Sequence, residues 1–211
     1  MKNNNFQPQN IMVFIKRLNK KVFTTHELIS ISNKSASTVV QSLNRLVHQS
    51  LIIKVYRGVW AESGTKRLSV FEVIPCLFPR QRVYVSFITA LHLHGMIEQI
   101  PQVITLASTA HSRTIRTKVG VFSVHQITPT FFDGFDWYRQ EGNFLIAEPE
   151  KALVDSLYLS GRKKKQFGSF PEMHIPPEFS YKKAVQWGKH IKEEKIRIYV
   201  LEKLKKMLKV K

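Results

Sequence analysis

Hydrophobic and polar residues alternate with a helical period between Ser35 and Gln49. Apolar side chains recur there at the i, i+3, i+4, i+7 spacing that places them on one side of an α-helix. The opposite side carries polar and basic side chains and no carboxylate. The pattern therefore predicts an amphipathic helix with one side on a core. The predicted core side consists of Ala36, Val39, Val40, Leu43, Leu46 and Val47.

A shorter helix and a turn are predicted just before this helix. Thr24 or Thr25, followed by Glu27, is typical of a capped helix start, so we expect a short helix over residues 25–31. The Ser-Asn-Lys-Ser stretch that follows has the composition of a turn. Its last residue, Ser35, is the predicted N-cap of the long helix.

A basic hairpin is predicted just after it. Two β-prone runs, at 51–56 and 59–61, flank Arg57 and Gly58, which indicates a tight or slightly bulged turn. Helix, turn, helix and hairpin in this order predict a winged helix-turn-helix domain over residues 1–62.

The solvent side of the long helix and the hairpin carry side chains suited to duplex DNA. Gln can bridge two sites on adenine, Arg can bridge two on guanine, and Ser or Thr hydroxyls can contact phosphates. Cations near the hairpin tip can contact a phosphate or the minor groove. The alternative is an ordinary solvated face, which amphipathicity alone also explains. The candidate DNA-binding residues are Lys34, Ser35, Ser37, Thr38, Gln41, Ser42, Arg45, Lys54 and Arg57.

The remaining chain predicts a second domain over residues 80–211. A helix is expected from about Tyr84 to Gly95 with Ser86 as its cap, and Pro149 between two glutamates predicts another helix to about Leu159. The fold class is therefore α+β, a winged helix-turn-helix followed by a mixed α/β domain with a small sheet and C-terminal helices. Strands are expected at 103–108, 119–127, 131–138 and 143–147, and helices at 180–191 and onward to 209.

Net charge is the property of the composition that most narrows the partner. The 211 residues include 33 Lys and Arg against 15 Asp and Glu, giving a formal net charge of +18, and the sequence pI is about 10.1. Such charge favours a polyanion, above all nucleic acid, but carries no sequence specificity. A membrane surface is the weaker alternative, since the sequence has neither an apolar run of spanning length nor a signal-peptide core, and we expect a cytoplasmic protein.

Two further cationic clusters lie far from the predicted hairpin in the sequence. An apolar stripe of Ile191, Ile198, Leu201, Leu204 and Leu208 is expected to dock the last helix on the second domain. The clusters are either solvated faces or a second surface for DNA, RNA or an acidic partner. This predicted secondary basic patch comprises Arg162, Lys163, Lys164, Lys165, Lys203, Lys205, Lys206 and Lys209.

Enzymatic signatures are weak. His92 and His94 are two residues apart on a predicted helix, where their side chains diverge, so we expect no metal site and no cofactor. A metal-dependent nuclease using Asp133, Asp136, Glu148 and Glu150 is a minor alternative. The two glutamates are also explained by a helix start. Cys76, in an apolar run, is expected to be a small buried residue.

Two stretches resemble the AbiEi family of antitoxins, part of type IV toxin–antitoxin systems. They are Tyr84-Val-Ser-Phe-Ile-Thr-Ala-Leu-His-Leu-His-Gly95 and Phe144-Leu-Ile-Ala-Glu-Pro-Glu-Lys-Ala-Leu-Val-Asp155, with the strand Ile104–Ser108 and the following Arg113 and Arg116 between them. The resemblance implies a repressor that autoregulates its own operon and counters a nucleotidyltransferase-type toxin in phage abortive infection, and it implies no catalytic residue. The main alternative is a winged-helix transcription factor whose second domain senses a ligand or dimerises.

Overall fold

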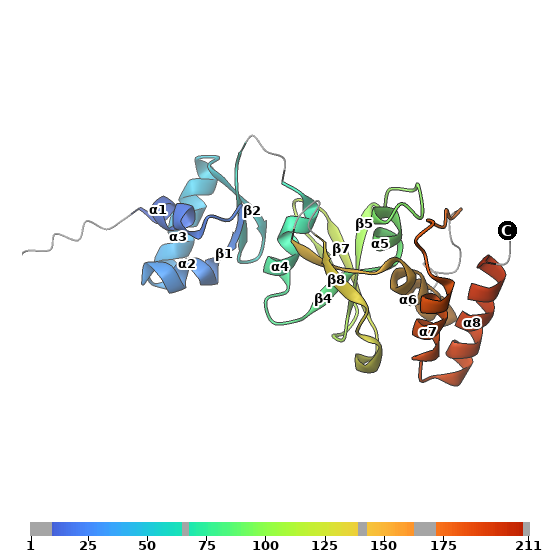
Figure 1. The fold of residues 1–211 in the computed structure, drawn as a ribbon. Coiled ribbons are helices and arrows are strands. Elements are labelled where there is room, and N and C mark those ends of the chain that lie inside the picture. The colour runs from blue at the N-terminus through green and yellow to red at the C-terminus, as the bar shows by residue number, and fades with distance from the viewer. Residues whose placement is uncertain (1–9, 65–67, 139–142, 163–171, 209–211) are drawn as a thin grey trace, which may run out of the picture. The chain divides into compact units, whose positions relative to one another are not determined.

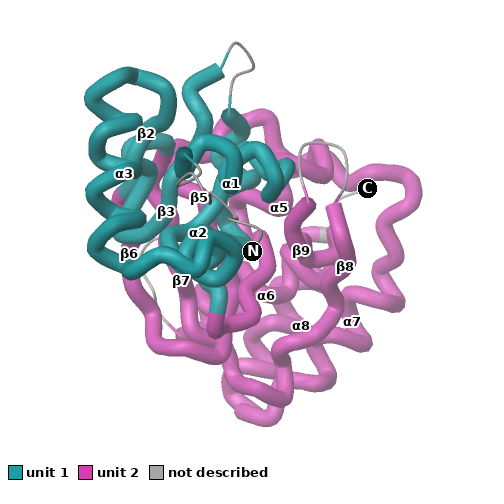
Figure 2. The backbone as a smooth tube through the Cα atoms, turned by 90° about the vertical axis from the view of Figure 1, so that its left-hand side faces the viewer, with its two compact units in different colours: residues 1–79, 117–119 teal, residues 80–116, 120–211 magenta. Residues whose placement is uncertain are grey.

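The computed structural model describes residues 10–64, 68–138, 143–162 and 172–208. These residues form eight α-helices and two β-sheets, a mixed α+β protein (Figure 1). The chain divides into two compact units (Figure 2). Unit 1 comprises residues 1–79 and 117–119, and unit 2 comprises residues 80–116 and 120–211. None of the described helices is long and apolar enough to cross a membrane.

Unit 1 combines three helices of eight or more residues with a three-stranded antiparallel sheet in the order β1-β3-β2. The helix α1 and the strand β1 had no counterpart in the sequence-based expectation, whereas α2, α3 and the β2–β3 hairpin fall where they were expected. The elements are α1 (Ile11–Leu18), β1 (Val22–Thr24), α2 (Thr25–Ser32), α3 (Ala36–His48), β2 (Ile52–Tyr56), β3 (Val59–Glu62), a 3-10 helix (Val70–Val73) and α4 (Ile74–Leu77).

Side-chain caps fix where α2 and α3 begin. The Thr24 hydroxyl accepts from the Glu27 amide at 3.2 Å while the Glu27 carboxylate accepts from the Thr24 amide at 2.7 Å, forming a capping box. Asn33 ends α2 with a left-handed φ of 52°, and the Ser35 hydroxyl then accepts from the Thr38 amide at 3.2 Å to begin α3. The predicted caps are therefore confirmed.

The core of unit 1 takes a narrower strip of α3 than the sequence predicted. Val39, Leu43 and Leu46 are buried against residues of α1, α2, β1, β2 and β3. Ala36 and Val40 are exposed, so their assignment to the core was wrong. The buried residues have the spacing i, i+4, i+7, which is typical of a helix that packs on a core along one narrow side.

Unit 2 is built on a six-stranded mixed sheet in the order β6-β7-β5-β4-β9-β8. The central strand β4 pairs antiparallel with β5 and parallel with β9, while β5 pairs parallel with β7. The outer strands β6 and β8 are antiparallel to their neighbours. The strands are β4 (Val83–Val85), β5 (Val103–Ser108), β6 (Arg113–Arg116), β7 (Val121–Gln126), β8 (Phe135–Tyr138) and β9 (Phe144–Ala147).

The helices of unit 2 pack around α6. Every residue from Glu150 to Leu159 is buried, and α5, α7 and α8 all contact α6 (Figure 1). A 3-10 helix at Pro129–Phe131 occupies the start of the predicted 131–138 strand, so that strand is shorter than expected. The helices are α5 (Phe87–Leu93), α6 (Pro149–Gly161), α7 (Tyr181–Lys189) and α8 (Glu194–Leu208).

Two helix assignments are corrected by the structure. Tyr84 belongs to β4, not to the first turn of α5, and Ser86 occupies the N-cap position without a capping hydrogen bond. On α8 the buried residues are Ile196, Val200 and Leu204, whereas Ile198 is 50% exposed. A helix that contacts α6 and α7 from one side buries positions i, i+4 and i+8, and Ile198 falls outside that row.

Candidate nucleic-acid interface and buried network

The structure brings most predicted DNA-binding residues together on the outward side of α3. Gln41 and Arg45, one helical turn apart, are both exposed. Ser42 and Lys34 are half-buried, so they lie at the margin of this face. The exposed members at the helix start are Ser35, Ser37 and Thr38.

Hydroxyl groups at the start of α3 already bond one another. The Ser35 hydroxyl lies 2.9 Å from that of Ser37 and 2.8 Å from that of Thr38, in addition to capping the helix. A phosphate oxygen contacting this turn would therefore meet a preformed cluster of hydroxyls and helix N-terminal amides. Ser35 acts first as a cap, a role that the sequence also predicted.

Two residues of the outward face were missed by the sequence reasoning. Asn44 and His48 are exposed and lie three and seven residues after Gln41, on the same side of the helix. Their spacing was visible in the sequence, and extending the polar face by i+3 and i+7 from Gln41 would have included them.

The β2–β3 hairpin presents its cations at one end. Its register shifts between Lys54 and Tyr56, which is a bulge, and Gly58 adopts a φ of 72° at the turn. Arg57 beside it is exposed. The Lys54 ammonium lies 5.4 Å from the centroid of the Trp60 ring, a contact that positions its stem on the sheet.

Charges in unit 1 are segregated. The first 79 residues contain three carboxylates, and each forms an ion pair with a lysine of the 16–21 segment. Within the described residues, the cations of the α3 face and the hairpin form no ion pair with a carboxylate, which leaves their charge available to a partner. The three pairs are Lys16–Glu62 at 3.2 Å, Lys20–Glu27 at 2.6 Å and Lys21–Glu72 at 2.8 Å.

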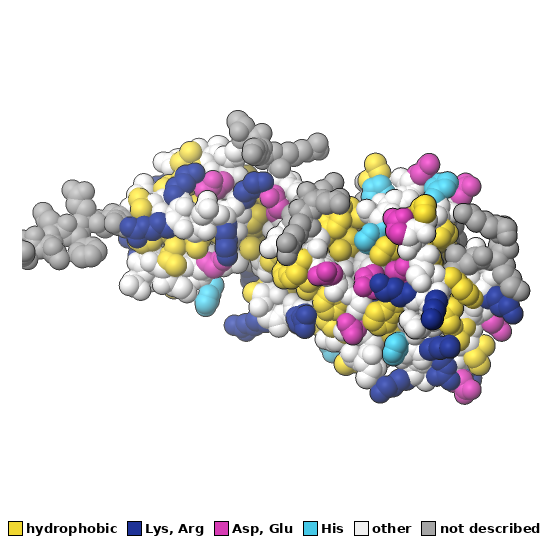
Figure 3. All heavy atoms as spheres, in the orientation of Figure 1, with side chains coloured by type: hydrophobic (Ala, Val, Ile, Leu, Met, Phe, Trp, Pro, Cys, Tyr) yellow, Lys and Arg dark blue, Asp and Glu magenta, His cyan; other side chains and the backbone are white. Residues whose placement is uncertain are grey.

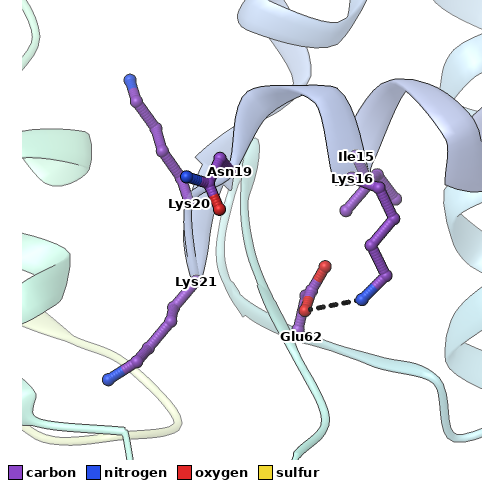
Figure 4. Close-up of a pocket in the computed structure, with 6 residues that line it drawn as sticks. All are labelled: Ile15, Lys16, Asn19, Lys20, Lys21 and Glu62. Carbon is purple, nitrogen blue, oxygen red and sulfur yellow. Dashed lines mark hydrogen bonds and ion pairs between the residues drawn. The ribbon is translucent and has the colours of Figure 1, made fainter.

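A small hollow between α1 and β1 illustrates this neutralisation (Figure 4). Three lysines line it, yet Lys16 points to Glu62 while Lys20 and Lys21 extend away in different directions. The cations do not converge, so the hollow is unsuited to binding an anion. Glu27, although burial raises its pKa, has a lowered pKa overall because Lys20 and the groups of Thr24 stabilise its charge.

The charges of unit 2 include a fully buried network. Lys151 and Asp155, one turn apart on α6, form an ion pair with no side-chain exposure. The hydroxyls of Tyr84 and Ser86 donate to Asp155 at 2.9 and 2.7 Å, and the Lys151 ammonium donates to the Tyr84 hydroxyl at 3.0 Å. The ammonium also lies 3.9 Å from the centroid of the Phe131 ring. The network therefore joins β4, the start of α5, and α6.

Burial shifts the pKa values of this network. It lowers the pKa of Lys151 and raises that of Asp155, while the attraction between the two charges opposes both shifts. Burial and the Asp155 charge raise the pKa of Tyr84 well above its ordinary value. Asp155 therefore has defined partners in the interior of unit 2, whereas the sequence predicted no specific role for it.

Each of the four carboxylates of the nuclease alternative has a partner within the protein. The Glu150 carboxylate is buried and accepts from the Ser180 amide at 2.7 Å, and Glu148 pairs with Lys183 at 2.9 Å. Asp133 and Asp136 accept from the adjacent backbone amides at 2.8 and 2.7 Å. Among the described residues, no group of three or more His, Cys, Asp or Glu side chains is placed to hold a metal ion.

The remaining candidate side chains contact the backbone. His92 Nδ1 lies 3.3 Å from the Ile97 carbonyl oxygen and His94 Nε2 lies 2.7 Å from that of Ala147. Cys76 is half-buried, and burial raises the pKa of its thiol to about 11, so the thiol stays protonated at neutral pH.

The predicted secondary basic patch is described only in part. Lys203, Lys205 and Lys206 are exposed on α8, and Figure 3 shows Lys and Arg side chains over the α7 and α8 end of unit 2. Arg162 forms an ion pair with Glu193, so its charge is shared. The other predicted members, Lys163, Lys164, Lys165 and Lys209, lie outside the described residues.

No protein-family model and no curated protein sequence matches this chain. The AbiEi resemblance therefore depends on the sequence alone, that is, on the two stretches and on the strand Ile104–Ser108 with Arg113 and Arg116. In the structure the first stretch forms the end of β4 and α5, and the second forms β9 and α6. Their polar members Tyr84, Ser86, Lys151 and Asp155 meet in the buried network. The resembling residues thus include those that hold the two stretches together.

Proposed function

We propose that unit 1 is a winged helix-turn-helix domain that binds duplex DNA, and that the chain is a transcriptional repressor. The observation that carries this proposal is the segregation of charge in unit 1. All three carboxylates of the first 79 residues pair with lysines at 16–21. Among the described residues, no cation of the α3 face or the hairpin pairs with a carboxylate. A face with cations and hydrogen-bonding side chains but no carboxylate is complementary to DNA.

The proposed docking places α3 in the major groove and the β2–β3 hairpin on the adjacent backbone. Gln41 and Arg45 then read base edges, with Asn44 and His48 further along the same face. Arg57 and Lys54 contact phosphate or the minor groove. Ser37 and Thr38, with the amides of the first turn of α3, contact a phosphate.

We further propose that the chain is an antitoxin that represses its own toxin–antitoxin operon and counters a nucleotidyltransferase-type toxin. This part follows from the AbiEi resemblance. It is supported by the fact that the resembling residues include the buried network of unit 2, so the likeness concerns residues with a defined role in the fold.

DNA binding is tested by measuring affinity for the promoter region upstream of the gene and for random duplex of equal length. Replacing Gln41 or Arg45 by Ala is expected to cost about 1–3 kcal/mol on the promoter site and much less on random DNA, because base contacts are lost. Lys16→Ala, which removes a cation already paired with Glu62, is the matched control and should change neither. Equal losses on both duplexes would contradict base reading by α3.

The antitoxin role is tested in cells with the full chain. We expect a nucleotidyltransferase-like reading frame next to the gene, whose product arrests growth. The Gln41→Ala/Arg45→Ala variant should still protect against that product while no longer repressing a promoter fusion. A metabolic neighbour in place of the toxin, or a variant that represses normally, would count against this proposal.

A further inference from the structure

A hollow of about 500 Å³ lies on unit 2, on one face of its sheet beside α5. This volume falls within the roughly 300–1,000 Å³ typical of small-molecule sites. Strands β5, β6 and β7 contribute its floor, and α5 and the segment before β5 contribute one side. The lining residues are Ile88, Gln99, Ile100, Pro101, Gln102, Val103, Thr105, Thr114, Arg116, Val121 and Ser123.

The strand register orders the floor into two rows. Thr105, Ser123 and Thr114 are register partners across β5, β7 and β6, which makes a row of hydroxyls. The next row on the same face consists of Val103, Val121 and Arg116. One row of the floor therefore consists of hydroxyl side chains. The other row is apolar on β5 and β7 and cationic on β6.

The groups available to a ligand lie at the β6 end. Arg116 and Thr114 are exposed. Within the described residues no carboxylate pairs with Arg116, and none of the lining residues is acidic. By contrast, the Thr105 hydroxyl already donates to the Ser86 carbonyl at 2.7 Å, and the Ser123 hydroxyl lies 3.1 Å from His125 Nε2. The hollow thus favours an anionic group at Arg116 and Thr114.

The opposite end offers an apolar wall. Ile100 is 70% exposed, the largest exposure among the large hydrophobic side chains described, and Ile88 and Pro101 also line the hollow. This wall lies beside β5, and β7 separates β5 from β6, which carries Arg116, so two strand spacings of about 4.8 Å place the wall and Arg116 roughly 10 Å apart. Gln99 and Gln102 add amide donors and acceptors at the same end. A ligand with an anionic group at one end and a flat, hydrogen-bonding body at the other matches this layout.

We propose that this hollow binds a nucleoside 5′-monophosphate, with the phosphate on Arg116 and Thr114 and the base against Ile100. The proposal does not depend on DNA binding by unit 1. The alternative role of Arg116 is to keep the edge strand β6 from pairing with another chain, a common function of charged residues on edge strands. That role needs neither Thr114 nor Ile100. Variants of these two residues therefore distinguish nucleotide binding from protection of the edge strand.

The test is calorimetric titration of the full chain with AMP, GMP, CMP and UMP. At least one nucleotide should bind, and its nucleoside and inorganic phosphate should each bind at least about tenfold more weakly, because each retains only part of the contacts. Arg116→Gln should weaken nucleotide binding by about tenfold to a hundredfold, the range implied by loss of a charge-assisted hydrogen bond. Thr114→Val and Ile100→Ser, both at exposed positions, should each weaken it several-fold.

Arg113→Gln is the matched control. Arg113 lies on the same strand but on its opposite face, where its guanidinium donates to the Gln81 side chain at 2.6 Å, and its replacement removes the same charge. It should leave nucleotide affinity unchanged. The proposal is overturned if none of the four nucleotides binds, if Arg113→Gln and Arg116→Gln weaken binding equally, or if inorganic phosphate binds as tightly as the nucleotides.

Discussion

The two units of this chain use opposite charges in different ways. In unit 1 the ion pairs lie at the surface, with Lys16 67% and Glu62 29% exposed in one of them. In unit 2 the Lys151–Asp155 pair is withdrawn completely from solvent. Among the described residues no carboxylate pairs with the cations of α3 and the hairpin, whereas the buried pair links three elements of the fold.

The difference separates charge that serves a partner from charge that serves the fold. A surface pair contributes little stability. Its main consequence is that it neutralises charge locally and so determines where on the surface the positive potential remains. A buried pair is costly to desolvate, and removing one partner leaves an uncompensated charge in the interior.

The largest effect is expected from breaking the buried pair. Lys151→Met leaves Asp155 buried without its cation and should lower the free energy of unfolding of unit 2 by about 3–5 kcal/mol. Urea unfolding followed by circular dichroism measures it. The double variant Lys151→Met/Asp155→Asn removes both charges while keeping an acceptor for Tyr84 and Ser86, and should recover part of the loss. A single-variant cost below about 1 kcal/mol would show that the pair is not a fold determinant.

A smaller effect is expected from the α8 cations. Among the described residues of the secondary basic patch, they are the ones that form no ion pair. If Lys203, Lys205 and Lys206 each contact a phosphate, their joint replacement by Gln should reduce the salt dependence of DNA affinity by about 0.9 per contact, up to three contacts. The thermal melt should hardly change, since all three are exposed. Unchanged salt dependence together with unchanged toxin protection would make this patch a solvated face.

The hairpin should show the same change in the salt dependence of DNA affinity, but for a single phosphate contact. Arg57→Ala is expected to weaken binding to all duplexes similarly and to lower the slope of log K against log salt by about one unit. Fluorescence anisotropy from low to moderate salt gives the slope. Lys20→Ala, in which the lost cation is already paired with Glu27, provides the comparison. A slope that stays constant in Arg57→Ala would place the hairpin tip away from DNA.

The smallest effect is expected from the surface pair between α1 and β3. A double-mutant cycle with Lys16→Gln and Glu62→Gln should give a coupling energy of about 0.2–1 kcal/mol, which added salt reduces. Lys16→Gln alone should leave DNA affinity unchanged. Coupling as large as that of the buried pair would remove the distinction between the units.

Elements with strong local signals were predictable from the sequence. The cap at Thr24, the cap at Ser35 and the Arg57-Gly58 turn each depend on a few neighbouring residues, and the structure has all three. Short strands were harder, because the three residues of β4 are held by pairing with β5 and β9, which are distant in sequence. The same β-prone residues therefore resembled the start of α5.

The candidate site was predictable to the same extent. The exposed residues of α3 could be predicted from the helical periodicity, and the same periodicity places Asn44 and His48 on the outward face. The buried network was not predictable, since Lys and Asp one turn apart on a helix usually indicate a solvated pair. Only the packing of Tyr84 and Ser86 against α6 reveals that Lys151 and Asp155 are interior. The hollow beside α5 likewise depends on strand register between β5, β6 and β7.

The burial of α6 on all sides has a consequence for how the protein is made. The helix α8 covers part of α6: Ile196 and Tyr199 lie beside Gly161, and the Tyr199 hydroxyl is 2.8 Å from the Ser160 hydroxyl at the end of α6. On the ribosome, α6 emerges before α8, and at about 5–20 residues per second the interval lasts roughly a few seconds. During that interval the surface of α6 that α8 covers in the folded protein lacks its covering helix. A chain that ends before Glu194 should therefore leave this apolar surface exposed.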